Sequence, residues 1–368
     1  MVTIKDVAEK AGVSISTVSN VLNQTKYVSP DLQKKVYQAV DELNYVRDSV
    51  ASNMKRGYTK TIGVITSDIC GLFYPYVVKG IYEIISKYGY SLTIYDSHVV
   101  KNEKGLQKEE ESFRHLFSNR VDGVIFVSNV SKKKEKSYLS KLKKQACMLK
   151  TTPLVSLERD FSKYGIDSVF YNNKNTAKMA VEHLIDCGCG RIAFISGPAG
   201  EEVPEERKQG YLEAIEEHGL SGEVKEGMME KGDYTHQSGY KAMKRILHQA
   251  WPIDGVYAAN DQMAIGALKA LKEQGIQVPE QIKLIGTDDV FATSIVEPPI
   301  STVHIKKKHM GRSAAKILLR RIEELQNMED GNVVQSVQEP IAKEMETRLV
   351  VRRSTDRSSR KEMEFVDW

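Results

Sequence analysis

The chain has 368 residues, which is enough for two or three domains with substantial cores. Its 53 basic and 49 acidic residues nearly balance, which excludes a polycationic nucleic-acid coat protein. No apolar run approaches the ~18 residues of a membrane span, the first residues lack a signal-peptide pattern, and four cysteines do not make a disulfide framework. We therefore expect a protein of the reducing cytoplasm.

The small positive excess is concentrated at the start of the chain. Residues 1–60 contain nine Lys or Arg and six Asp or Glu, so their net charge of +3 is most of the +4 of the whole chain. A segment that binds phosphates requires such an excess. Further along, Cys187, Cys189 and His183 suggest part of a metal site, but a fourth ligand is missing. Ordinary thiols are favoured, and we expect neither metal nor cofactor.

Two short helices joined by a glycine turn open the chain. Residues 3–11 form the first, with Thr3 as its cap and Asp6 at the capping-box position. Ser14 caps the second, which buries one apolar stripe. Its other face carries the short side chains of Ile15, Ser16, Ser19, Asn20 and Asn23. A helix of this kind fits the major groove of DNA, and we interpret it as a recognition helix.

A third helix begins at Ser29-Pro30, so residues 1–45 are predicted to form a helix-turn-helix DNA-binding domain. The alternative is an unrelated three-helix bundle. Residues 46–60 predict a hinge helix that contains Met54 and is too short to be stable alone. It would fold when paired with a twin on DNA. The plainer alternative is a basic linker.

From Thr61 onward, predicted strands and helices alternate in two consecutive series. The strands are 61–66, 91–95, 122–127 and 154–157 in the first series, then 168–171, 191–196, 255–259, 283–287, 301–305 and 348–351. This pattern predicts an α/β core of two doubly wound parallel-sheet subdomains over residues 61–355. The N-subdomain spans about 61–160 plus 305–333, and the C-subdomain about 161–304 plus 334–355.

Several polar residues lie just past predicted strand ends, Arg207 at the start of the helix after one of them, and ligands bind beyond the strand ends in such sheets. They are Glu158-Arg159-Asp160, Arg207, Asn260-Asp261 and Asp288-Asp289, with Phe73 or Tyr74 and Tyr234 as an aromatic floor. Carboxylates, an amide and a guanidinium suit vicinal hydroxyls. Helix caps and surface ion pairs are the alternative for each residue, Asp261 above all, and paired carboxylates also occur in glycoside hydrolases.

Common enzyme signatures are missing from the sequence. There is no GxxxxGK(S/T), GxGxxG, HExxH or GxSxG motif, so an enzyme is poorly supported. The lysine runs 132–134 and 306–308 are expected on solvated faces.

Along nearly its whole length the chain resembles the lactose-repressor/galactose-repressor (LacI/GalR) family of bacterial transcriptional regulators. The matching motifs include Thr3-Ile-Lys-Asp-Val-Ala8, Ala11-Gly-Val-Ser14, Thr17-Val-Ser19, Val28-Ser-Pro30, Arg191-Ile-Ala-Phe-Ile-Ser-Gly-Pro198, Asn260-Asp-Gln-Met-Ala264 and Ile285-Gly-Thr-Asp-Asp289. The resemblance implies a homodimeric repressor of carbohydrate genes that binds a palindromic operator. Its core, like a periplasmic binding protein, would hold a sugar, sugar acid or sugar phosphate.

The resemblance also implies roles for individual residues. Ile15, Ser16 and Asn20 take base-reading positions. The residues expected to contact the DNA backbone are Thr3, Ser14, Asn23, Tyr27 and Ser29. Thr17 and Ser19 are the other residues of the predicted DNA-binding set. Met54 takes the position of a minor-groove wedge. Arg207, Asn260 and Asp288 match the positions that contact the effector in the family, and Tyr234 matches an aromatic residue of the same site. Glu158 stands where relatives often have Asp. Asn20 replaces a usual Arg, which predicts adenine instead of guanine at its contact.

Ligand in the cleft is expected to change how the subdomains and the hinge segments sit, with a coupling of ~1–3 kcal/mol. Rival hypotheses are a solute-binding receptor, disfavoured by the DNA-binding head, and a core regulated by a phosphocarrier-type protein. Residues 356–368 carry no leucine heptads and predict a mobile tail, or alternatively a docking peptide ending in Phe365 and Trp368. We expect a cytoplasmic, nucleoid-associated protein without membrane contact.

Overall fold

The computed structural model describes residues 2–23, 26–45, 57–97, 104–329 and 339–359. The chain forms two compact units, Met1–Thr59 and Lys60–Trp368. In the described ranges, no helix is both long and apolar enough to cross a bilayer. The predicted hinge, including Met54, lies mainly outside these ranges, as do residues 360–368 of the predicted tail.

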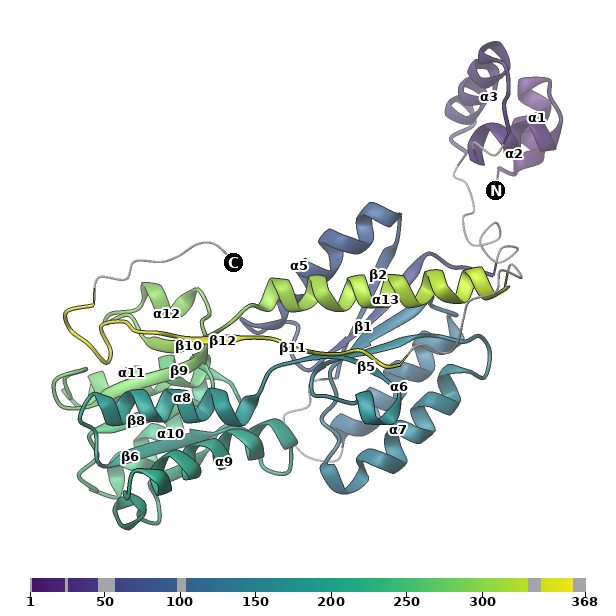
Figure 1. Ribbon diagram of the computed structural model, residues 1–368. Coiled ribbons are helices and arrows are strands. Elements are labelled where there is room, and N and C mark those ends of the chain that lie inside the picture. Colours follow the sequence, from purple (N-terminus) through teal and green to yellow (C-terminus); the bar gives the residue numbers. More distant parts are fainter. Residues whose placement is uncertain (1, 24–25, 46–56, 98–103, 330–338, 360–368) are drawn as a thin grey trace. The chain divides into compact units, whose positions relative to one another are not determined.

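The first unit contains the three predicted helices: α1 (Ile4–Ala11), α2 (Ile15–Asn23) and α3 (Pro30–Glu42) (Figure 1). The carboxylate of Asp6 accepts hydrogen bonds from the backbone N–H of Thr3 at 2.7 Å and from its hydroxyl at 2.8 Å. Ser14 Oγ accepts from the backbone N–H of Thr17 at 3.1 Å. These predicted caps are confirmed. Ser29 occupies the N-cap position of α3, but its side chain makes no capping bond.

In the described ranges the second unit contains two sheets, as predicted, and each of them has six strands. The N-lobe comprises β1 (Thr61–Thr66), α5 (Tyr74–Ile85), β2 (Ser91–Asp96), α6 (Lys104–Ser118), β3 (Gly123–Phe126), α7 (Lys132–Ala146), β4 (Leu154–Glu158), β5 (Asp167–Phe170), α13 (Lys307–Glu329) and β11 (Ala342–Glu344). Its strand order is β11-β5-β4-β3-β1-β2, all parallel. Ile62 and Ile65 are fully buried in two apolar clusters, because helices cover both faces of the sheet.

The C-lobe comprises α8 (Asn173–Asp186), β6 (Ile192–Ser196), α9 (Glu202–Glu217), β7 (Met229–Lys231), α10 (His236–His248), β8 (Gly255–Ala258), α11 (Asp261–Glu273), β9 (Lys283–Asp288), α12 (Ala292–Ile295), β10 (Ser301–Ile305) and β12 (Thr347–Val350). Its strand order is β12-β10-β9-β8-β6-β7, and only β12 pairs antiparallel to its neighbour. The chain crosses between lobes near residues 171–172, 306 and 345–346.

The predicted strand at 168–171 belongs to the N-lobe and not, as predicted, to the C-subdomain. β5 pairs in parallel with β4, so the assignment of residues 161–171 to the C-subdomain was wrong. Only a short 3₁₀ turn, Ser162–Tyr164, separates the two strands, and the chain therefore stays beside β4. Arg321 of α13 holds β5 in the N-lobe by donating hydrogen bonds to both carboxylate oxygens of Asp167, at 2.8 and 2.9 Å.

The last strands also divide differently from the prediction. β12 corresponds to the predicted strand 348–351, but β11, inside the range assigned to the C-subdomain, joins the N-lobe sheet beside β5. All its side chains are exposed, so no alternation of apolar residues marks it in the sequence. Beyond β12, Ser359 Oγ of the predicted tail donates to the backbone carbonyl of Val351 at 2.9 Å.

Two glycines allow α5 and α13 to pack closely along the N-lobe (Figure 1). A Cβ atom on Gly80 would lie 2.1 Å from the carbonyl oxygen of Lys308, and one on Gly311 would lie 2.0 Å from that of Val77. Backbone atoms of a helix cannot yield to such a contact as a side chain can. The separation of the two helices therefore depends on these glycines.

We expect Gly80→Ala to destabilise the core, although alanine is usually better than glycine in a helix by roughly 0.5–1 kcal/mol. The clash with α13 should outweigh that gain and cost about 1–3 kcal/mol, the usual cost of overpacking. Urea unfolding of the purified protein measures the difference. Gly105→Ala is the matched control, because no atom lies within 4 Å of a Cβ there and the change should be neutral or stabilising. Equal effects of the two substitutions would contradict this account.

Candidate functional site

The predicted DNA-contacting face lies on α2 of the first unit. Val18 and Val21 of this helix are buried against Val7 and Val36, which leaves the opposite face outward. The side chain of Ile15 is 44% exposed and that of Tyr27 is 89% exposed, a large apolar surface to leave in water on so small a domain.

The remaining predicted contacts surround this helix. Thr3, Ser14 and Ser16 are exposed, and Thr17, Ser19, Asn20 and Ser29 are half-buried. The Ser14 hydroxyl lies 2.7 Å from that of Ser16 and 2.9 Å from that of Thr17, so the capping residue also orders the first turn. Asn23 ends the helix.

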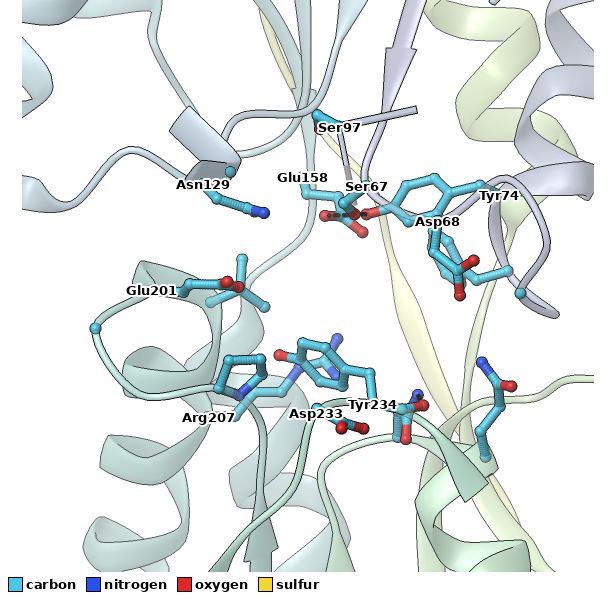
Figure 2. Close-up of a pocket in the computed structure, with 18 of the residues that line it drawn as sticks. Ser67, Asp68, Tyr74, Ser97, Asn129, Glu158, Glu201, Arg207, Asp233 and Tyr234 are labelled. Atoms are coloured by element: carbon cyan, nitrogen blue, oxygen red, sulfur yellow. Dashed lines mark hydrogen bonds between the residues drawn. The ribbon is translucent and has the colours of Figure 1, made fainter. Parts of the chain in front are cut away.

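A cavity of about 860 Å³ lies between the two lobes of the second unit, at the carboxyl ends of the strands (Figure 2). All the predicted effector residues line it: Phe73, Tyr74, Glu158, Arg207, Tyr234, Asn260 and Asp288. Their shared position after the strands, and not any single residue type, predicted this convergence.

Arg207 of α9 forms the floor of the cavity on the C-lobe side and is only 3% exposed. Its Nε donates to Asn173 Oδ1 at 3.1 Å, its Nη2 donates to the Tyr171 hydroxyl at 3.0 Å, and its Nη1 donates to the Ala259 carbonyl. Nη2 also lies 3.8 Å from Asp288 Oδ1. The guanidinium is thus fixed from several sides before any ligand arrives.

Asp288 ends β9 beside this guanidinium. Burial raises the pKa of its carboxyl to about 7, against the lowering effect of Arg207 and Lys307. The Lys307 ammonium donates to the backbone carbonyls of Asp288 at 2.6 Å and Asp289 at 2.9 Å. Lys307 is 2% exposed, so the expectation that the run 306–308 lies on a solvated face was wrong for its middle residue. These carbonyls hold it at the start of α13.

Asn260 and Tyr234 form a second part of the floor. The Asn260 side chain caps α11 by accepting from the backbone N–H of Met263 at 3.0 Å, and its amide donates to the Tyr234 carbonyl at 3.0 Å. A Cβ on Gly197 would lie 2.5 Å from Tyr234 Cζ, so glycine is required for the ring to lie there. Among the described residues the buried Tyr234 hydroxyl has no hydrogen-bond partner, which leaves it for a ligand.

The N-lobe wall is built around Glu158. The Tyr74 hydroxyl donates to Glu158 Oε2 at 2.9 Å and accepts from Ser67 Oγ at 2.9 Å. Burial raises the pKa of the Glu158 carboxyl, although Arg207 and the Tyr74 hydroxyl lower it. The rings of Phe73 and Tyr74 meet edge to face, with centroids 5.2 Å apart. The longer arm of glutamate at this position is therefore held by a tyrosine of the same lobe.

Three of these residues have left-handed backbone conformations, which are rare outside glycine. The φ angles are +66° at Glu158, +67° at Tyr234 and +115° at Asp288. Such conformations cost of order 1–3 kcal/mol and gather at ligand sites, where the surrounding structure imposes them. The backbone thus marks the same edge of the sheets as the side chains do.

The sequence neighbours of the cavity residues bind other side chains of the protein instead of facing the cavity. Arg159 pairs with Glu135 at 2.5 Å, and Asp261 accepts from Thr302 Oγ1 at 2.7 Å. Asp289 lies 2.7 Å from His304 Nδ1 and 2.5 Å from Arg352 Nη2. Burial raises the pKa of Asp289, but His304 and Arg352 prevail and bring it to about 2. None of these residues lines the cavity.

Sequence reasoning missed several residues that do line the cavity: Ser67, Asp68, Asn129, Tyr171, Glu201 and Asp233. Tyr171 directly follows β5, so the correct lobe assignment would have found it. Glu201 stands in the loop before α9, where no strand end points to it. Elsewhere, Cys187 Sγ lies 3.7 Å from His183 Nε2, and within the described ranges no group of three possible ligands could hold a metal ion.

Stability should fall as pH rises through neutrality because of Glu201. Burial and the charge of Glu158 raise the pKa of Glu201 to about 7, above the usual carboxyl value. The folded state then binds more protons than the unfolded state. This stabilising effect is complete below the unfolded pKa and is lost as pH rises through about 7.

Glu201→Gln, which stays neutral, should therefore lose less stability than the wild type between pH 5 and pH 8. Urea unfolding at a series of pH values measures the two slopes. Glu205→Gln, an exposed position of α9, is the control that should keep the wild-type slope. Parallel curves for Glu201→Gln and wild type would contradict the assignment.

Comparison with known proteins gives two family matches. Residues 3–48 match the bacterial regulatory proteins of the lacI family, and residues 181–355 match the periplasmic binding protein-like domain. The HTH-type transcriptional repressor PurR of Vibrio atlanticus (strain LGP32) is 32% identical over 325 residues, 88% of this chain and 93% of the relative. The ribose operon repressor of Halalkalibacterium halodurans is 31% identical over 323 residues, 88% and 91% of the two chains.

Solved structures agree with these relatives. The lac repressor dimer bound to operator and the anti-inducer ONPF aligns with a TM-score of 0.79 and 26% identity, over 96% of this chain and 99% of that one. The complex of the transcriptional regulator CelR with cellobiose aligns with a TM-score of 0.66 and 29% identity, over 96% and 100%.

Proposed function

The chain belongs to the lacI family of bacterial regulatory proteins, and we propose that it represses carbohydrate-utilisation genes in response to a sugar bound between its lobes. It is a DNA-binding transcriptional repressor controlled by a ligand, and its relatives are repressors and not enzymes. The observation that carries the sugar proposal is the cavity itself. Its carboxylates, its unpartnered tyrosine hydroxyl and its aromatic rings suit a hydroxylated ring.

Family membership supports a homodimer that binds a two-fold symmetric operator. We propose that α2 reads the bases through Ile15, Ser16 and Asn20, and that Met54 wedges into the central minor groove. We further propose that the protein works in the cytoplasm at the nucleoid. A phosphocarrier-type protein acting on the core remains the second candidate, and a pull-down with such a protein tests it.

The ligand contacts stand next to the points where the chain crosses between lobes, and this placement supports control by ligand. Tyr171, at the first crossing, accepts from Arg207. Lys307, just after the second crossing, is bound to the carbonyls of Asp288 and Asp289. We propose that a ligand seated on Arg207 and Asp288 fixes the angle between the lobes, and that this angle alters operator affinity by a coupling of about 1–3 kcal/mol.

The experiment has two stages. A thermal-shift screen of sugars on the full chain identifies ligands, and operator binding is then measured by fluorescence anisotropy with and without each ligand. A ligand should change operator affinity by roughly 5- to 150-fold. An unchanged operator affinity with every tight ligand would overturn the proposal.

A further inference from the structure

Acidic side chains dominate the lining of the cavity. Among the described residues, five carboxylates line it, against two basic side chains. The acids are Asp68, Glu158, Glu201, Asp233 and Asp288, and the bases are Lys134 and Arg207. Because the cavity is partly closed from water, this imbalance acts on a ligand more strongly than the same charges would on an open surface.

Neither basic residue offers an anion a buried binding site. The guanidinium of Arg207 already donates to Asn173, Tyr171 and Ala259, and its charge faces Asp288 at 3.8 Å. Lys134 lies in the first turn of α7 and is exposed, so water screens its charge. A phosphate or carboxylate in the cavity would thus meet mainly carboxylates.

Two of the carboxylates face each other from opposite lobes. Glu201 stands on the C-lobe wall and Glu158 on the N-lobe wall (Figure 2). Glu158 accepts a hydrogen bond from Tyr74, whereas no hydrogen bond or ion pair holds the Glu201 side chain within the described ranges. When both carboxyls are ionised, a group placed between them must donate hydrogen bonds to both walls. Hydroxyl groups can do this, and ionised phosphate or carboxylate groups, which only accept, cannot.

We propose that the cavity selects uncharged, hydroxyl-rich ligands and rejects phosphorylated or carboxylated ones, and that Glu201 sets this selectivity. The proposal rests on the ligand-binding role proposed above and narrows it, because sugar acids and sugar phosphates leave the range of ligands. A like charge placed against a wrong ligand is one of the repulsive elements by which a binding site rejects it. Glu201 fits that role because its carboxylate has no hydrogen bond or ion pair with any other residue that the structure describes.

The test compares matched pairs of ligands on the full chain by isothermal titration at pH 8, where the Glu201 carboxyl is largely ionised. The pairs are glucose with glucose 6-phosphate and with glucuronate, ribose with ribose 5-phosphate, and cellobiose with cellobionate. In each pair that binds, the anionic member should bind at least tenfold more weakly than the neutral one. Glu201→Gln should reduce that ratio at least threefold, and Glu205→Gln, an exposed acid on the same helix, should leave it unchanged.

An anionic member that binds wild type as tightly as its neutral partner would overturn the selectivity, and so would a Glu201→Gln variant with the wild-type ratio. The first result would still leave ligand-controlled repression standing, provided that the anion changes operator affinity. Conversely, neutral ligands that bind with the expected ratio but never alter operator affinity would overturn the proposed function and leave the selectivity intact.

Discussion

Substitution of Arg207 by lysine is expected to abolish the response of operator binding to ligand. The guanidinium reaches Asn173, Tyr171 and Ala259 at once and faces Asp288, and a lysine ammonium cannot reproduce that planar set of donors. The substitution leaves Asp288 buried beside a displaced charge. Breaking a buried pair in this way costs about 3–5 kcal/mol of folding stability. Loss of a buried, hydrogen-bonded charge at a binding site costs about 2–5 kcal/mol of binding free energy, so ligand affinity should fall by at least about 30-fold.

Isothermal titration with a ligand from the screen measures that loss, and anisotropy with operator DNA measures the response. Arg245→Lys is the matched control in the same lobe, since Arg245 is half exposed and pairs with Glu230 at 2.6 Å away from the cavity. Circular dichroism and the melting temperature establish whether Arg207→Lys is folded. A folded variant whose ligand affinity stays within threefold of wild type would show that Arg207 is not a ligand contact.

Substitution of Asn20 by arginine should change the operator base that the recognition helix prefers. Asparagine pairs with adenine through two hydrogen bonds, and arginine pairs with guanine in the same way. Each such pair discriminates by about 1–3 kcal/mol, so the preferred base should switch by roughly 5- to 150-fold in affinity. The helix should keep its position in the domain because the substitution does not change its apolar face, which includes Val18 and Val21.

Selection from random DNA with wild type and variant measures the switch. Wild type should recover adenine at one symmetric position, and the variant should recover guanine there. Gln38→Arg is the control, because it adds the same charge at an exposed position of α3 and should raise the affinity for all DNA sequences alike without changing the preferred base. Guanine in the wild-type selection, with no change in the variant, would refute the assignment.

Much of the fold and of the candidate site can be predicted from the sequence because it depends on local sequence patterns. Caps such as Ser14 and buried strands such as 61–66 follow from short patterns, and polar residues after strands mark the cavity edge. The lobe to which β5 belongs depends instead on the distant contact between Asp167 and Arg321, which no local pattern contains. Lys307 was misjudged for the same reason, since the carbonyls that bind its ammonium lie at the end of β9, far from it in the sequence.

The candidate site shows the same division. Glu158, Arg207 and Asp288 were found because strand ends converge in a parallel sheet, whereas Glu201 reaches the cavity from a loop. Of the adjacent acidic pairs, sequence alone cannot say which member faces the cavity. Asp288 does so, while Asp289 pairs with Arg352, and both residues have positive φ angles, +115° and +55°.

The late position of β11 and β12 in the chain has a consequence for folding during translation. β11 completes the edge of the N-lobe sheet and β12 completes the edge of the C-lobe sheet, only a few positions apart in the chain. Arg352, which neutralises the buried Asp289, follows directly. A ribosome must therefore translate through β12 (Thr347–Val350) before both lobes can finish folding. Nascent chains stalled before β11 would expose two unpaired sheet edges at once, and they should depend on chaperones until both strands emerge.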